Sequence, residues 1–197
     1  MTITVAPAIP STAPQFVSDD AFTSAVLNST NLFRTQHNAT SVTYNETLAQ
    51  YASDYLNTGD SDNDDDDACP PFEHSGGPYG ENLALGCSDV QGCVDMWGNE
   101  RSMYNFDDPQ FGMDTGHFTQ LVWKNTTDVG CGRKLCGGNR GWYLVCEYWP
   151  RGNVIGQFPE EVGRQVTGVQ SAGHPTLAVG LTLQALLCLG VMLLLML

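Results

Sequence analysis

Basic residues are scarce in this chain. Lys and Arg together number 8, against 22 Asp and Glu, which gives a net charge of −14 at pH 7. The basic residues are scattered from Arg34 to Arg164, so no positive stripe is available to follow a phosphate backbone. The sequence therefore excludes nucleic acid as the partner.

The paired C-x-x-C spacing of structural zinc sites is also absent. The chain has 7 cysteines, and all of them except Cys188 fall between Cys69 and Cys146. This clustering indicates a disulfide framework in an oxidising compartment, and Cys188, which lies in an apolar terminal run, is left out of it. Four N-x-S/T sequons support the same compartment as candidate N-glycosylation sites: Asn28, Asn38, Asn45 and Asn125.

A signal peptide is not visible either. The opening residues, MTITVAPAIPSTAPQF, contain neither a basic segment nor a continuous apolar one. Because the cysteines and sequons indicate secretion, we expect the start of the sequence to be truncated or misassigned. The alternative is a cytosolic protein whose cysteines stay reduced.

Composition divides the chain into one domain with appendages. Residues 1–17 are rich in Pro, Ala, Ser and Thr and are expected to be disordered, whereas residues 18–160 carry enough apolar residues for one folded domain. Residues 161–176 form a linker with small residues, and residues 177–197 a hydrophobic tail. This layout is typical of a removable GPI attachment signal, with Ser171 and Gly173 as candidate attachment residues. A transmembrane tail anchor is the alternative.

Periodicity predicts three helices followed by strands. Ser18 caps a first helix that runs to about His37, Asn45 caps a second, and a third extends from Ser88 to about Asn105. After Gly116, the segments FTQLVWK, VGCGRKLC and WYLVCEYW have the composition of strands. Because these strands are consecutive, we expect an antiparallel meander within an α+β layered domain.

Four ionisable residues stand in unusual settings. His74 and Glu81 lie in the glycine-rich segment EHSGGPYGEN, and His117 lies in GHFTQLVW. Glu100 falls on the apolar stripe of the third predicted helix, where a carboxylate needs a partner. Imidazoles are the natural partners, so the four residues are candidates to converge.

Several of these segments carry a family resemblance. GHFTQLVWKNT, YLVCEYWPRGN, GENLA and the His37-Asn38 pair resemble the signatures of the CAP superfamily, the cysteine-rich secretory, antigen 5 and pathogenesis-related proteins. The resemblance covers about residues 22–158 and is greatest to the secreted pathogen-related proteins of yeast. It implies a three-layer αβα sandwich with a central antiparallel sheet, and a cleft where the family's tetrad falls on His74, Glu81, Glu100 and His117.

The resemblance also implies a set of disulfide pairs, and at one position this sequence differs from the family pattern. The pairs would be Cys69–Cys136, Cys131–Cys146 and, as the remainder, Cys87–Cys93, although six cysteines allow 15 connectivities. Glu147 stands where the family usually has Asn, which changes the local hydrogen bonding.

The imidazoles of the tetrad suggest a metal without requiring one. His74 and His117 could bind a divalent ion such as Zn²⁺ or Mg²⁺, and a metal-dependent hydrolase or protease is one reading. Against it, the sequence has no H-E-x-x-H motif, and two histidines without a third ligand make a weak site. We therefore expect no required cofactor and no catalytic residues.

A third set of residues indicates a lipid ligand. Tyr104, Phe106 and Phe111 have the spacing of the loop with which the yeast relatives hold sterols, and rigid aromatic faces outside regular structure suit a flat apolar molecule. We expect both phenylalanines to be replaceable by Ala at little cost in stability. The alternative is that Tyr104 belongs to the core and the phenylalanines anchor the loop. The resemblance also implies that fatty acids can bind between the first and third helices.

The sequence is compatible with three functions. The first is an extracellular, membrane-anchored protein that binds sterols, fatty acids or similar small lipids and exports or sequesters them. The second is the metal-dependent hydrolase, and the third is a cell-wall or host-interaction module.

Overall fold

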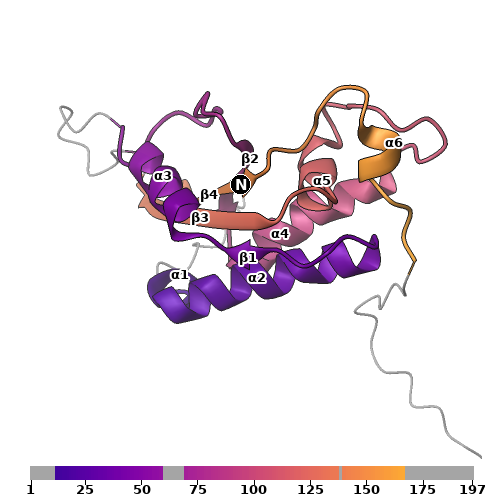
Figure 1. Ribbon diagram of the computed structural model, residues 1–197. Coiled ribbons are helices and arrows are strands. Elements are labelled where there is room, and N and C mark those ends of the chain that lie inside the picture. Colours follow the sequence, from indigo (N-terminus) through magenta and orange to yellow (C-terminus); the bar gives the residue numbers. More distant parts are fainter. Residues whose placement is uncertain (1–11, 60–68, 138, 167–197) are drawn as a thin grey trace, which may run out of the picture.

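The computed structural model describes residues 12–59, 69–137 and 139–166. The elements are α1 (Pro14–Val17), α2 (Asp19–Gln36), β1 (Thr43–Tyr44), α3 (Glu46–Leu56), β2 (Gly80–Cys87), α4 (Val90–Asn99), the 3-10 helix η1 (Glu100–Ser102), α5 (Gly116–Leu121), β3 (Asp128–Cys136), β4 (Gly141–Trp149) and α6 (Phe158–Glu161). A four-stranded sheet lies between α3 on one face and α1, α2 and α4 on the other (Figure 1). The predicted α+β sandwich is confirmed.

Strand β4 shows why both faces of the sheet are covered. Trp142, Leu144 and Tyr148 belong to the core on the side of α2 and α4, whereas Tyr143 and Val145 belong to a smaller core beneath α3. Side chains alternate between the two faces of a strand, and in β4 the side chains on both faces are buried. The exposed exception on this strand is Trp149.

The helix starts follow the sequence signals. Ser18 accepts a hydrogen bond from Ala21 N at the start of α2, and Asn45 accepts from Thr47 N and Leu48 N at the start of α3. In α2, the apolar side chains of Phe22, Val26 and Phe33 are buried, whereas Leu32 is 53% exposed. Each cap satisfies backbone donors that the first helical turn leaves without an internal partner.

The N-terminal prediction is wrong in its last residues. Pro14–Val17 form α1, and Phe16 is buried against Trp142, with ring centroids 4.8 Å apart. The favourable burial of this aromatic side chain orders a segment whose Pro and Ala content suggested disorder. Residues 1–11 lie outside the described part of the chain.

The sheet is mixed rather than a pure antiparallel meander. Its order is β1-β3-β4-β2, in which β3 and β2 each pair antiparallel with β4, while the short β1 pairs parallel with β3. Strand β2 was not predicted. Its sequence, GENLALGC, has two glycines and no regular alternation, because it is covered on both faces.

The segment FTQLVWK is not a strand. Gly116–Leu121 form α5, and the Glu100 carboxylate accepts from Phe118 N at 3.0 Å in its first turn. Thr119 and Gln120 are as buried as Phe118, so the apolar composition reflects an enclosed helix rather than a half-buried strand. The third predicted helix is also shorter than expected: α4 ends at Asn99 and continues only as η1.

A buried arginine holds the end of α5. Arg34 is fully buried and donates to the carbonyl oxygens of Thr40, Leu121, Trp123 and Thr126 at 2.7–3.1 Å. Burial lowers the pKa of Arg34 to about 10, because desolvation disfavours the charged form. The guanidinium thus joins α2 to the turn that connects α5 with β3.

Three disulfides link the described residues, in the pairs that the family resemblance implies: Cys69–Cys136, Cys87–Cys93 and Cys131–Cys146. The first joins residues separated by 67 positions, a closure that contributes about 4 kcal/mol in the chain-entropy account. Within the described ranges, no helix has the length and apolar character needed to cross a membrane.

Candidate functional site

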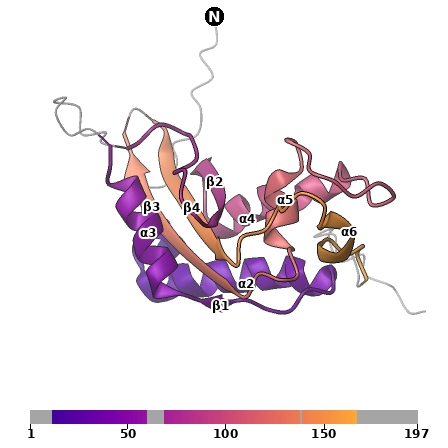
Figure 2. The ribbon, with the colours of Figure 1, turned by 45° about the horizontal axis from the view of Figure 1, so that its top comes forward.

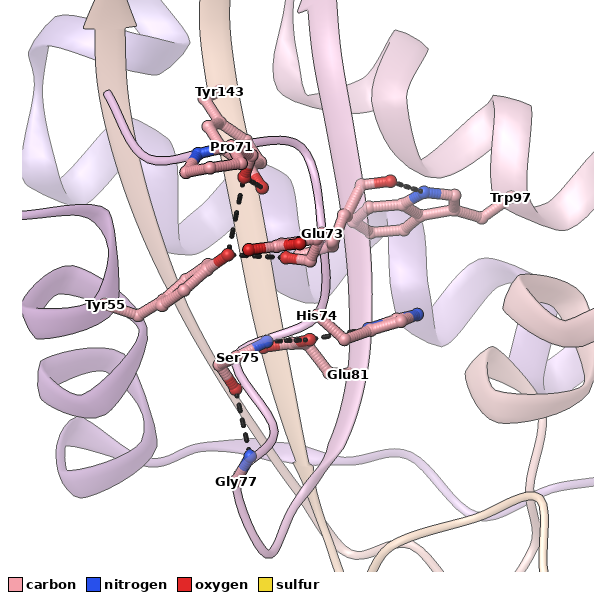
Figure 3. Close-up of polar contacts among 10 residues, drawn as sticks. Tyr55, Pro71, Glu73, His74, Ser75, Gly77, Glu81, Trp97 and Tyr143 are labelled. Atoms are coloured by element: carbon pink, nitrogen blue, oxygen red, sulfur yellow. Dashed lines mark hydrogen bonds and ion pairs between the residues drawn. The ribbon is translucent and has the colours of Figure 1, made fainter. Parts of the chain in front are cut away.

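The four candidate residues form two His–Glu pairs. His74 Nδ1 lies 2.6 Å from Glu81 Oε1, and Ser75 N donates to the same carboxylate at 3.0 Å (Figure 3). His74 comes from the loop before β2 and is 65% exposed at its side chain, whereas the Glu81 side chain, on β2, is 6% exposed. The carboxylate therefore lies in the wall of the site and the imidazole at its rim.

The second pair stands on α5 and η1. His117 Nδ1 lies 2.6 Å from Glu100 Oε1, while the other Glu100 oxygen accepts from Phe118 N. The Trp97 ring lies nearly parallel to the His117 ring, with centroids 6.4 Å apart. Glu100 thus has the imidazole partner that its place on an apolar stripe required.

Strand β2 connects the two pairs. Asn82, next to Glu81, donates through Nδ2 to the His117 carbonyl at 3.0 Å. Trp97 donates through Nε1 to the Leu83 carbonyl at 2.9 Å, a bond visible in Figure 3. Buried backbone and amide hydrogen bonds therefore hold both His–Glu pairs to one strand.

A metal at His74 and His117 is not supported. Among the described residues, no group of three or more His, Cys, Asp and Glu side chains is placed to hold a metal ion. Each imidazole instead turns Nδ1 to its own glutamate, so the carboxylates act as hydrogen-bond acceptors for His74 and His117.

Sequence reasoning singled out Glu147 only as a departure from the family, not as part of the site. Glu147 lies opposite Glu81 in the β2–β4 register and is 1% exposed. Burial raises its pKa to about 9, with the neighbouring Glu81 carboxylate as the second cause. The signal in the sequence was the glutamate within the apolar strand WYLVCEYW.

The proposed lipid-binding residues differ from one another in burial. Tyr104 is 7% exposed and packs edge-on against Phe106 and Phe118, so it belongs to the core. Phe106 is half-buried, and its ring also stacks on His37 at a centroid distance of 6.0 Å. Phe111 is 43% exposed. This packing argues against the expectation that Phe106 can be replaced by Ala at little cost in stability.

A cavity lies beside Phe111. It has a volume of about 320 Å³ and is lined by residues 103–105, 108 and 110–115. Its apolar wall includes Met103 and Met113, which are 61% and 83% exposed. The loop that forms it lies at the end of the molecule away from α3 (Figures 1 and 2).

The sequence matches the CAP family, described as the cysteine-rich secretory protein family, over residues 27–148. The chain belongs to this family. It is 46% identical over 142 residues to Protein PRY2 of Saccharomyces cerevisiae, a match that covers 72% of this chain and 41% of that protein. It is 44% identical over 140 residues to Repressed by EFG1 protein 1 of Candida albicans, over 71% of this chain and 49% of that protein. The chain thus matches less than half the length of these two relatives.

A solved structure has a fold similar to that of this chain. Venom allergen-like protein 4 of Schistosoma mansoni superimposes with a TM-score of 0.51 at 25% identity, covering 73% of this chain and 94% of that one. The similarity supports the αβα arrangement in which the two His–Glu pairs lie.

The space between α2 and α4, where a fatty acid was expected, is closely packed at one point. A Cβ on Gly98 would lie 2.2 Å from the Phe33 ring, so the aromatic ring contacts the helix backbone there. Phe33 itself is 4% exposed. Any chain-like ligand between these helices has to bind away from this contact.

The remaining predicted sites fall on the surface or outside the described residues. Asn28, Asn38 and Asn125 are exposed, whereas Asn45 uses both side-chain atoms internally, capping α3 and donating to Asp128. The candidate anchor residues Ser171 and Gly173, the tail 177–197 and Cys188 lie outside the described residues.

Proposed function

We propose that this CAP-family protein binds sterols and similar small apolar lipids at the cavity beside Phe111. The observation that carries the proposal is the joint presence there of an open cavity of about 320 Å³ and an exposed aromatic face. That volume lies at the lower end of the range of about 300–1,000 Å³ for small-molecule sites. The cavity therefore suits one end of a rigid ligand rather than the whole of it.

The chemistry of the wall favours a flat apolar ligand. Phe111 supplies a rigid face, and the thioether side chains of Met103 and Met113 can adapt to the outline of a fused ring system. Behind them, Tyr104 and Phe118 keep the base of the loop packed on the core. A rigid base with an adaptable rim limits the ordering cost of binding.

The proposal includes a role outside the cell. Three disulfides among the described residues and membership of a family described as secretory support an oxidising compartment. We propose that the protein exports or sequesters lipids at the cell surface, anchored through the predicted GPI site at Ser171 or Gly173.

We propose binding rather than catalysis at the His–Glu pairs. Both carboxylates already accept hydrogen bonds from an imidazole and from a backbone N–H, which suits them to hold the cleft together. The metal-dependent hydrolase predicts instead a chelator-sensitive turnover of peptide or ester substrates that is lost in His74→Ala and His117→Ala. Such a turnover would replace this part of the proposal.

Saturable binding of labelled cholesterol to the purified full chain tests the proposal. Phe111→Ala should weaken binding, because it removes the exposed aromatic face. Phe72→Ala is the matched control, since Phe72 is also exposed, at 55%, but lies on the loop before β2. Absence of saturable binding by the unmodified chain would overturn the proposal, and equal weakening by both variants would exclude the loop as the site.

A further inference from the structure

Two glutamates face each other inside the sheet. Glu81 on β2 and Glu147 on β4 are direct cross-strand partners, so their side chains lie on the same face. That face is covered by α3: at Gly130, the β3 partner of Glu147, an added Cβ would lie 2.3 Å from the backbone of Ala49 and Asn45. Water is thereby kept from the pair, and Glu147 is 1% exposed.

Two ionised carboxylates in this position would repel each other and would have no proton to share, because an ionised carboxylate only accepts hydrogen bonds. Glu81 already accepts hydrogen bonds from His74 Nδ1 and Ser75 N. Among the described residues, Glu147 Oε1 has no hydrogen-bond partner. The proton of the pair therefore belongs on Glu147.

We propose that Glu147 is a neutral carboxylic acid in the folded protein at neutral pH, and that it donates its proton to Glu81 and so fixes the carboxylate that holds His74. Glu147 is then a positioning residue, which acts on the imidazole through Glu81. This inference does not depend on lipid binding, because the pair lies beneath α3 and not at the loop of Phe111.

Among the described residues, no Lys or Arg offsets the effect of burial on Glu147. Burial and Glu81 are the causes that raise its pKa to about 9. The other titratable groups close to the pair are Tyr55 on α3, Glu73 and His74 on the loop before β2, and Tyr143 and Tyr148 on β4. The tyrosines are neutral near pH 7, because burial raises the pKa of each of them further.

The consequence is a fold that loses stability as the pH rises. A carboxyl group whose folded pKa is raised keeps its proton when folded but releases it when unfolded, so unfolding is favoured at higher pH. The contribution is complete below the ordinary value of 4.5 and is lost progressively up to about pH 9. Each pH unit in this window should raise the unfolding equilibrium constant up to tenfold.

Chemical unfolding of the full chain between pH 5 and pH 9 tests the proposal with Glu147→Gln. The Gln amide can still donate to Glu81 but cannot ionise. The unfolding equilibrium constant of the wild type, divided by that of the variant, should therefore rise with pH by at least tenfold across the window. Glu160→Gln, an exposed carboxyl on α6, is the matched control and should leave the profile unchanged. Parallel profiles for the wild type and Glu147→Gln would overturn the proposal.

Infrared spectroscopy of the unmodified chain gives an answer that does not depend on the variant folding. A carbonyl band of a protonated carboxylic acid should be present at pH 7 and should disappear as the pH is raised toward 10. Absence of that band at pH 7 would also overturn the proposal.

Discussion

Phe111→Ala and Phe106→Ala should separate ligand binding from stability. Phe111 is 43% exposed. A phenylalanine has about 200 Å² of surface, so about 85 Å² of Phe111 is open to a ligand. At about 25 cal/mol per Å², covering that area contributes about 2 kcal/mol, or about 30-fold in Kd. Because a bound sterol covers only part of the ring, we expect Phe111→Ala to weaken binding between about 10-fold and 30-fold.

The stability changes should run in the opposite order. Phe106 packs against His37, Tyr104 and Phe118, so Phe106→Ala should cost about 2–3 kcal/mol, compared with about 3–5 for a fully buried phenylalanine. Phe111 has one aromatic neighbour, Phe158, at 6.4 Å, and Phe111→Ala should cost about 1 kcal/mol. Titration with a fluorescent sterol gives the affinities and urea unfolding gives the stabilities. If Phe111→Ala folds normally and keeps the wild-type Kd within twofold, the reasoning is refuted.

Three further predictions concern single sites elsewhere in the fold. Arg34→Met should lower the free energy of unfolding by about 3–5 kcal/mol, because four backbone carbonyls lose a charged donor, and a loss below 1 kcal/mol in denaturant unfolding would contradict that role. Peptide mapping of the protein expressed through a secretory pathway should find no glycan at Asn45, whose side chain caps α3, while the exposed sequons are occupied; a glycan at Asn45 would show that the cap is dispensable. His37 should oppose folding in acid, because burial lowers its pKa and the unfolded state gains a proton as the pH falls below 6.5. His37→Gln should therefore flatten the acid side of the stability profile, and an unchanged profile would contradict this.

The sequence predicted the parts of the fold that depend on local chemistry. Ser18 and Asn45 are side-chain caps whose position in front of apolar periodic segments can be read directly from the sequence. Strand β4 is rich in aromatic residues, and a glycine-rich segment separates it from β3. For Glu100, the cost of placing a carboxylate on an apolar stripe was enough to predict an imidazole partner.

The rest depended on contacts between distant residues. Gly116–Leu121 is helical although its composition favours a strand, because Glu100 binds a backbone N–H of its first turn and Arg34 binds a carbonyl at its end. Phe16 in α1 is buried against Trp142, a residue far away in the sequence. The Glu81–Glu147 pair follows from the β2–β4 register, and β2 itself carries no regular alternation that would have revealed it.

Photochemical crosslinking of a diazirine-bearing sterol to the full chain, followed by peptide mapping, tests the central claim most directly. The account predicts that the label falls on residues 103–115, and that unlabelled cholesterol suppresses it. Labelling that falls instead between α2 and α4, or that unlabelled cholesterol does not suppress, would contradict a lipid site at the loop of Phe111.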